Sequence, residues 1–93
     1  MSIQSFRCEH TARLFALQPV ARWSSVATVA LRKLRMLHAA HRLQDLRSPP
    51  GNRLEALQGD RRGQHSIRIN DQWRLCFVWT QEGPTGVEIV DYH

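Results

Sequence analysis

Two neighbouring runs with alternating large side chains constrain the fold of this chain more than any other feature. In residues 65–69 and 73–79 every second residue is large and mostly apolar, so each run predicts a β-strand with one buried face. The two buried faces coincide when Ile67 lies opposite Leu75, which leaves residues 70–72 as the loop of a hairpin. A slip of one residue would turn the buried face of one strand outward, so the register is strongly specified.

This register has an electrostatic consequence, because it places Arg68 directly opposite Arg74. Like charges that face each other across two strands destabilise the pair by roughly a few tenths of a kcal/mol or more. Two interpretations are open. The arginines can be solvated or paired with Asp60, Asp71 or Asp91, or they can hold a phosphate group and stabilise the charge that develops on it during transfer.

The rest of the chain predicts helices first and strands later, which indicates an α+β fold. Ser24 and Ser25 are candidate N-caps of the longer helix, and Lys33 lies on its basic face, which we expect to be solvated. Leu17 is expected to pack at the end of the shorter helix. The expected helices span 10–17 and 25–40, with a further turn at 42–46, and the other expected strands span 2–7, 54–57 and 87–92.

The length of 93 residues corresponds to one small domain, and we expect a single domain over residues 1–93. This length excludes multidomain enzymes and two-lobed cofactor folds. No apolar run approaches the roughly 18 residues that cross a bilayer, and the first residues lack the apolar segment of a secretory signal. We therefore expect a cytoplasmic protein without a membrane partner.

The charge of the chain points to a polyanionic partner. It carries 13 Lys and Arg residues against 8 Asp and Glu residues, and every basic residue except Lys33 is an arginine. Guanidinium groups pair bidentately with phosphate, so such an excess favours a nucleic acid. A GC-rich genome also enriches arginine, so charge alone separates these two explanations poorly.

Candidates for chemistry gather at the C-terminus, where His93 follows Asp91 and Tyr92. An imidazole transfers protons readily near neutral pH, and a tyrosine can donate a hydrogen bond or stack on a base. Cys8 and Cys76 lack the spacing of a metal motif, and the pair of histidines on the longer helix has no further ligand at motif spacing. The sequence therefore predicts neither a metal nor a cofactor.

Three segments together resemble the HigB toxins of type II toxin–antitoxin systems, within the RelE/ParE superfamily. They are LQGDRRG at residues 57–63, SIRINDQWR at residues 66–74 and DYH at residues 91–93, and the resemblance extends over nearly the whole chain. It implies a fold like that of the microbial ribonucleases, with two N-terminal helices packed on a twisted antiparallel sheet.

The resemblance also implies an activity, the cleavage of messenger RNA in the ribosomal A site without a metal, through attack by the 2′-hydroxyl group. It assigns charge stabilisation to Arg74, phosphate positioning to Arg68 and acid–base catalysis to His93. Asp91 would orient His93, and Tyr92 would hold the substrate. Further substrate contacts are expected from the following residues: Gln58, Arg61, Arg62 and Asn70.

Two departures from the family pattern predict a toxin of moderate potency. Gln58 stands where many members have lysine, and Glu55 stands where some have histidine. The family implies a HigA-like helix-turn-helix antitoxin as partner, contact with the ribosome and messenger RNA, and contact with operator DNA only through the antitoxin. Two alternatives remain open: a ParE-like toxin that inhibits DNA gyrase, and an inactive module that binds RNA or the ribosome.

Overall fold

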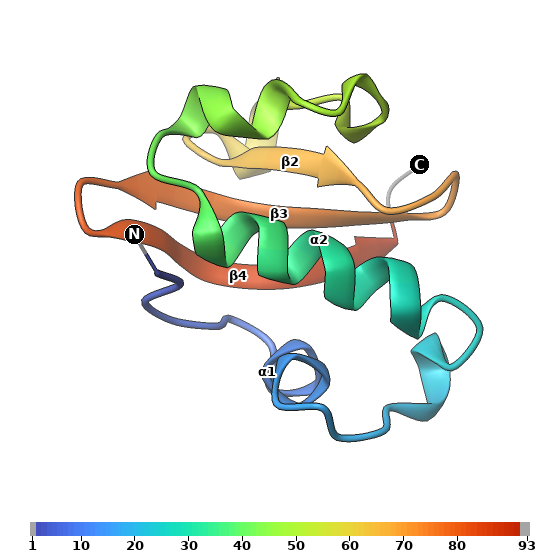
Figure 1. Cartoon of the computed structure of the whole chain (residues 1–93). Helices are drawn as coiled ribbons and strands as arrows, with labels where there is room; N and C mark the ends of the chain where they lie inside the picture. Colours follow the sequence, from blue (N-terminus) through green and yellow to red (C-terminus); the bar gives the residue numbers. More distant parts are fainter. Residues whose placement is uncertain (1, 92–93) are drawn as a thin grey trace.

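The computed structural model describes residues 2–91, in which two α-helices cover one face of an antiparallel sheet (Figure 1). This arrangement confirms the predicted α+β class. No helix within these residues is long and apolar enough to cross a membrane. The α-helices are α1 (Glu9–Phe15) and α2 (Ala27–Ala39), and the strands follow the order β1 (Glu55–Ala56), β2 (His65–Arg68), β3 (Trp73–Thr80) and β4 (Gly83–Asp91).

The register predicted for the β2–β3 hairpin is confirmed. Ile67 lies opposite Leu75, and Arg68 lies opposite Arg74. The side chain of Asn70 shapes the connecting loop, since its Oδ1 accepts hydrogen bonds from the backbone N–H groups of Gln72 and Trp73 at 2.9 and 2.8 Å. An Asn side chain that bonds the backbone in this way replaces part of a backbone turn.

The core lies between α2 and the sheet. Ala30, Leu34 and Leu37 form the buried stripe of α2, as the helical spacing predicts, and they belong to one cluster with Ile67 and Leu75 of the hairpin. Full burial of one leucine or isoleucine side chain stabilises a fold by about 1.5–3 kcal/mol. The cluster therefore fixes which face of the sheet is covered by the helices and which face is left for other contacts.

Two expectations about α2 are wrong. The helix begins after Val26, and neither Ser24 nor Ser25 caps it, because residues Ala21–Trp23 form a 3-10 turn and Ser24 already has helical backbone angles. An N-cap has a non-helical backbone, which Ser24 does not have, and the N-cap position of α2 is taken by Val26. Lys33 is buried rather than solvated, with 8% of its surface exposed.

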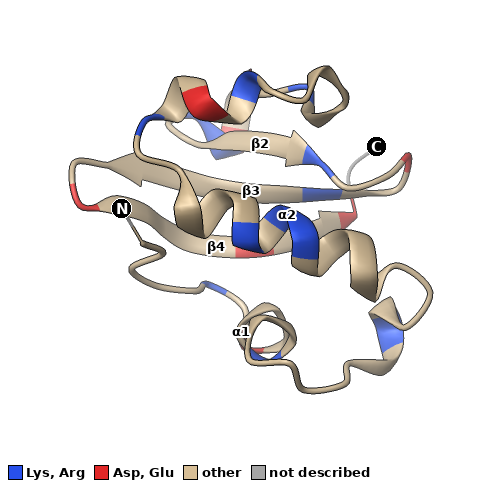
Figure 2. Cartoon of the chain, viewed as in Figure 1, with Lys and Arg blue, Asp and Glu red and all other residues tan. Residues whose placement is uncertain are grey.

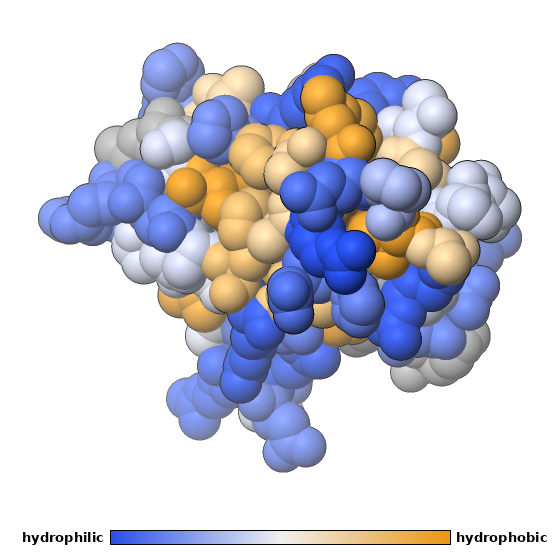
Figure 3. Space-filling view, turned by 90° about the horizontal axis from the view of Figure 1, so that it is seen from below, coloured by the Kyte–Doolittle hydropathy of each residue, from blue (hydrophilic) through white to orange (hydrophobic). Residues whose placement is uncertain are grey.

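The expectation that Leu17 packs at the end of α1 is wrong, because the side chain of Leu17 is exposed. Its backbone has φ +67°, a left-handed conformation that turns the chain away from the helix axis and directs the side chain outward. Leu17 borders a shallow hollow of about 430 Å³ between the end of α1 and the start of α2. Figure 3 views the molecule from this side and shows apolar patches between hydrophilic side chains.

The N-terminal segment does not form the strand expected at residues 2–7. Phe6 makes an isolated parallel bridge with Val87 of β4, and the Arg7 N–H donates to the Val87 carbonyl at 3.0 Å. The Val87 N–H in turn donates to the Ser5 carbonyl at 3.1 Å. The segment therefore protects the outer edge of β4, in the way that loops often cover sheet edges, without extending the ladder.

Candidate functional site

The candidate site lies on the sheet face that α1 and α2 leave uncovered. Arg68, Arg74 and Val90 form one row across β2, β3 and β4. Side chains alternate along a strand, so this row faces away from Leu75, which belongs to the helix-covered core. Figure 2 shows the basic positions of β2 and β3 side by side near the β2–β3 loop.

The guanidinium group of Arg74 is fixed by contacts to separate segments of the chain. Its Nε donates to the Ser66 hydroxyl at 2.8 Å, and its Nη2 donates to the Arg53 carbonyl at 2.8 Å. The Glu55 carboxylate lies 3.4 Å from the same Nη2. Only 11% of the Arg74 side chain is exposed, so its donors are held in a defined orientation before any ligand arrives.

Arg68 is held more loosely than Arg74. It forms an ion pair with Asp71 in the hairpin loop, and the Asp71 side chain is fully exposed. Because Asp71 is fully exposed, solvent screens this pair, and a phosphate group can compete with Asp71 for the partly buried Arg68. Asp71 is one of the carboxylates that the sequence offered as partners for the two arginines.

Glu55 is the residue that sequence reasoning missed as part of this site. It lies opposite Ser66 in the pairing of β1 with β2, which brings its carboxylate to Arg74. The sequence had identified Glu55 only as a departure from the family pattern. Because β1 contains only Glu55 and Ala56, no alternating pattern could have assigned a face to the residue.

Comparison with known proteins identifies the family. Residues 4–93 match the model of the HigB-like family, described as the RelE-like toxin of the type II toxin–antitoxin system HigB. The chain belongs to the HigB-like toxin family. It is 52% identical to Toxin HigB-1 of Vibrio cholerae and 44% identical to an uncharacterized protein of Haemophilus influenzae, each over 56 residues. These 56 residues are 60% of this chain, and they cover 59% and 55% of the two relatives, less than two thirds of either.

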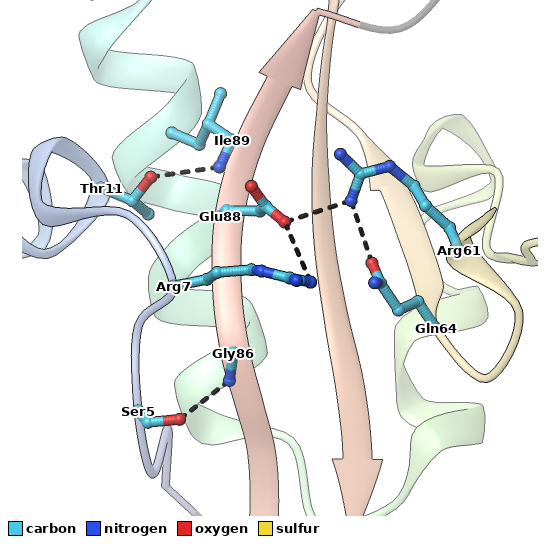
Figure 4. A network of polar contacts seen from close by, with 8 residues as sticks. All are labelled: Ser5, Arg7, Thr11, Arg61, Gln64, Gly86, Glu88 and Ile89. Carbon is cyan, nitrogen blue, oxygen red and sulfur yellow. Dashed lines mark hydrogen bonds and ion pairs between the residues drawn. The ribbon is translucent and has the colours of Figure 1, made fainter.

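Arg61 of this HigB-like chain, for which substrate contact stays a prediction, has partners within the protein (Figure 4). Its Nη1 donates to Gln64 Oε1 and to a Glu88 carboxylate oxygen, both at 3.1 Å. Arg7 lies 3.9 Å from the same carboxylate oxygen. Two guanidinium groups therefore surround the largely buried Glu88, and Arg61 joins the turn before β2 to β4.

The other expected substrate residues lie at different places around the sheet. Gln58 and Arg62 are exposed at the two ends of the 3-10 turn Gly59–Arg61, whereas the Oδ1 of Asn70 is occupied by the hairpin loop. Asp91, at the end of β4, accepts a hydrogen bond from Gln72 at 3.2 Å. Tyr92 and His93 lie outside the described residues, so their catalytic roles stay predictions.

Cys76 lies two residues from Arg74 on β3, in the candidate site, but is unsuited to nucleophilic chemistry. Burial raises the pKa of its thiol to about 11, an effect that the nearby Arg61 and Arg74 oppose only in part. A thiol with such a pKa is protonated at neutral pH and reacts slowly. In the described part of the chain, no group of three or more His, Cys, Asp or Glu side chains could hold a metal ion.

Proposed function

We propose that this chain is the toxin of a type II toxin–antitoxin system, and that it cleaves messenger RNA in the ribosomal A site without a metal or cofactor. The observation that carries the proposal is the Arg74 guanidinium, fixed beside Arg68 on the open face of the sheet. Membership of the HigB-like family supports it. We also propose that, within the family, the chain is similar to the Pseudomonas toxin GraT.

In the proposed reaction the RNA supplies its own nucleophile. The 2′-oxygen forms a bond to the neighbouring phosphorus while the bond from phosphorus to the 5′-oxygen breaks, leaving a 2′,3′-cyclic phosphate and a 5′-hydroxyl end. Arg74 stabilises the negative charge that develops on the phosphate oxygens, and Arg68 positions the phosphate. His93 transfers a proton as general acid or base, Asp91 orients it and Tyr92 holds the substrate.

The remaining charges fit a protein that binds a large RNA. Exposed basic residues on α2 (Arg32 and Arg35) and beside the site (Arg62) would contact ribosomal RNA, so binding should weaken steeply with salt. We further propose a HigA-like helix-turn-helix antitoxin as partner, contact with operator DNA only through it, and a cytoplasmic location.

The experiment is to induce the chain alone in cells and to map the 5′ ends of transcripts, with and without functional ribosomes. We expect new 5′-hydroxyl ends within translated codons, and only when ribosomes are functional. Growth arrest with intact transcripts and inhibited gyrase would instead support the ParE-like alternative. Ribosome binding without new ends would support an inactive binding module.

A further inference from the structure

A buried polar pair connects α2 to the segment that holds Arg74. Lys33, on α2, donates a hydrogen bond from its Nζ to the Oδ1 of Asn52. Lys33 is 8% exposed and Asn52 is fully buried. Burial of an ammonium group costs free energy unless its donors are satisfied, and it lowers the pKa of Lys33 here, an effect to which the charges of Arg32 and Arg68 add.

Asn52 connects several segments at once. Its Nδ2 donates to the Leu46 carbonyl at 3.1 Å and to the Ser48 carbonyl at 3.3 Å, while its Oδ1 accepts from Lys33. The side chain thereby joins α2 to the 3-10 turns Leu43–Arg47 and Pro50–Asn52. A buried amide with several satisfied hydrogen bonds specifies one backbone arrangement, because each alternative leaves polar groups unpaired.

The residues that follow Asn52 make direct contact with Arg74. Arg53 has a left-handed backbone, with φ +48°, and its carbonyl accepts the hydrogen bond from Arg74 Nη2. Glu55, two residues further along, places its carboxylate 3.4 Å from the same Nη2. A non-glycine residue keeps a left-handed conformation when its surroundings determine it, and Asn52 is the immediate anchor.

We propose that Lys33 and Asn52 are positioning residues for Arg74. They hold residues 53–55 so that the Arg53 carbonyl and the Glu55 carboxylate orient the guanidinium toward a phosphate. The kinetic consequence rests on the proposed function, but the orientation of Arg74 does not. A purely structural role for the pair would stabilise the fold and leave Arg74 unaffected.

The kinetic experiment uses Lys33→Met, which keeps the length of the side chain and removes its donor. Arg13→Met, at an exposed position of α1, is the control for the loss of one positive charge. We expect Lys33→Met to lower kcat for cleavage of ribosome-bound messenger RNA roughly tenfold with KM unchanged. In an Arg74→Lys background, Lys33→Met should cause no further loss of kcat. A loss of kcat by the same factor in the parent and in the Arg74→Lys background would overturn the proposal.

A second measurement needs neither ribosome nor activity. The ¹⁵N resonance of Arg74 Nε reports its hydrogen bond to Ser66, and we expect Lys33→Met to shift it and Arg13→Met to leave it in place. Asn52→Asp keeps the oxygen and loses the Nδ2 donors, so it should produce the same shift. It is the variant to measure if Lys33→Met does not fold. An unchanged Arg74 resonance in either folded variant would overturn the proposal. If the parent protein does not cleave messenger RNA but Lys33→Met still shifts the Arg74 resonance, the result counts against the proposed function alone.

Discussion

The carboxylate of Glu55 governs how readily Arg74 can accept a phosphate, because an incoming anion meets its negative charge 3.4 Å from Nη2. Glu55→Gln keeps an oxygen acceptor for Arg74 and removes that charge. We therefore expect single-turnover cleavage of ribosome-bound messenger RNA to rise severalfold. Glu82→Gln, in the exposed turn before β4, is the charge-matched control. A large loss of cleavage in Glu55→Gln would contradict this expectation and would indicate that the carboxylate accepts a proton.

The two cysteines should differ in reactivity. Burial raises the pKa of Cys76 to about 11, so its reactive thiolate forms only as the pH approaches that value, whereas Cys8 is half-buried. At about pH 8, iodoacetamide should modify Cys8 first and reach Cys76 only after unfolding. Mass spectrometry of the peptides during labelling measures both rates. Early modification of Cys76 in the folded protein would show that its side chain is accessible.

The β2–β3 loop is the element in which a predicted substrate contact and a structural role can be separated. Asn70 accepts hydrogen bonds from two backbone N–H groups of this loop, so Asn70→Ala should lower the free energy of unfolding by about 1–2 kcal/mol in urea titrations. Asn70→Asp keeps the acceptor oxygen and should lower the free energy of unfolding by less than Asn70→Ala does. Unchanged stability with weaker RNA binding would favour the substrate role instead.

The predictability of each element depended on how local its determinants are. The hairpin register followed from period-two alternation and loop length, which lie within residues 65–79. The start of α2 could not be predicted, because the preceding 3-10 turn decides the backbone angles of Ser24. The burial of Lys33 depends on Asn52, which is 19 residues away in the sequence, and no pattern in the helix indicates such a partner.

At the scale of the whole molecule, the sequence predicted the opposed arginines and offered Asp71 as a partner, but it did not predict the groups that hold Arg74. Arg68 and Arg74 emerged from the register alone. The partners of Arg74 come from residues 53–66, whose arrangement depends on tertiary contacts rather than on periodicity. The assignment of Arg61 as a substrate contact came from the family pattern, which did not reveal that Glu88 and Gln64 hold its guanidinium.

The fixed guanidinium of Arg74 is the feature on which the proposed reaction depends. The measurement is the yield of 5′-hydroxyl ends on translated messenger RNA for the parent and for Arg74→Ala, with circular dichroism and ribosome co-sedimentation as controls. We predict that Arg74→Ala stays folded and ribosome-bound but loses cleavage by a factor of about 10² or more. Cleavage by Arg74→Ala at close to the parental rate would contradict the role assigned to this residue.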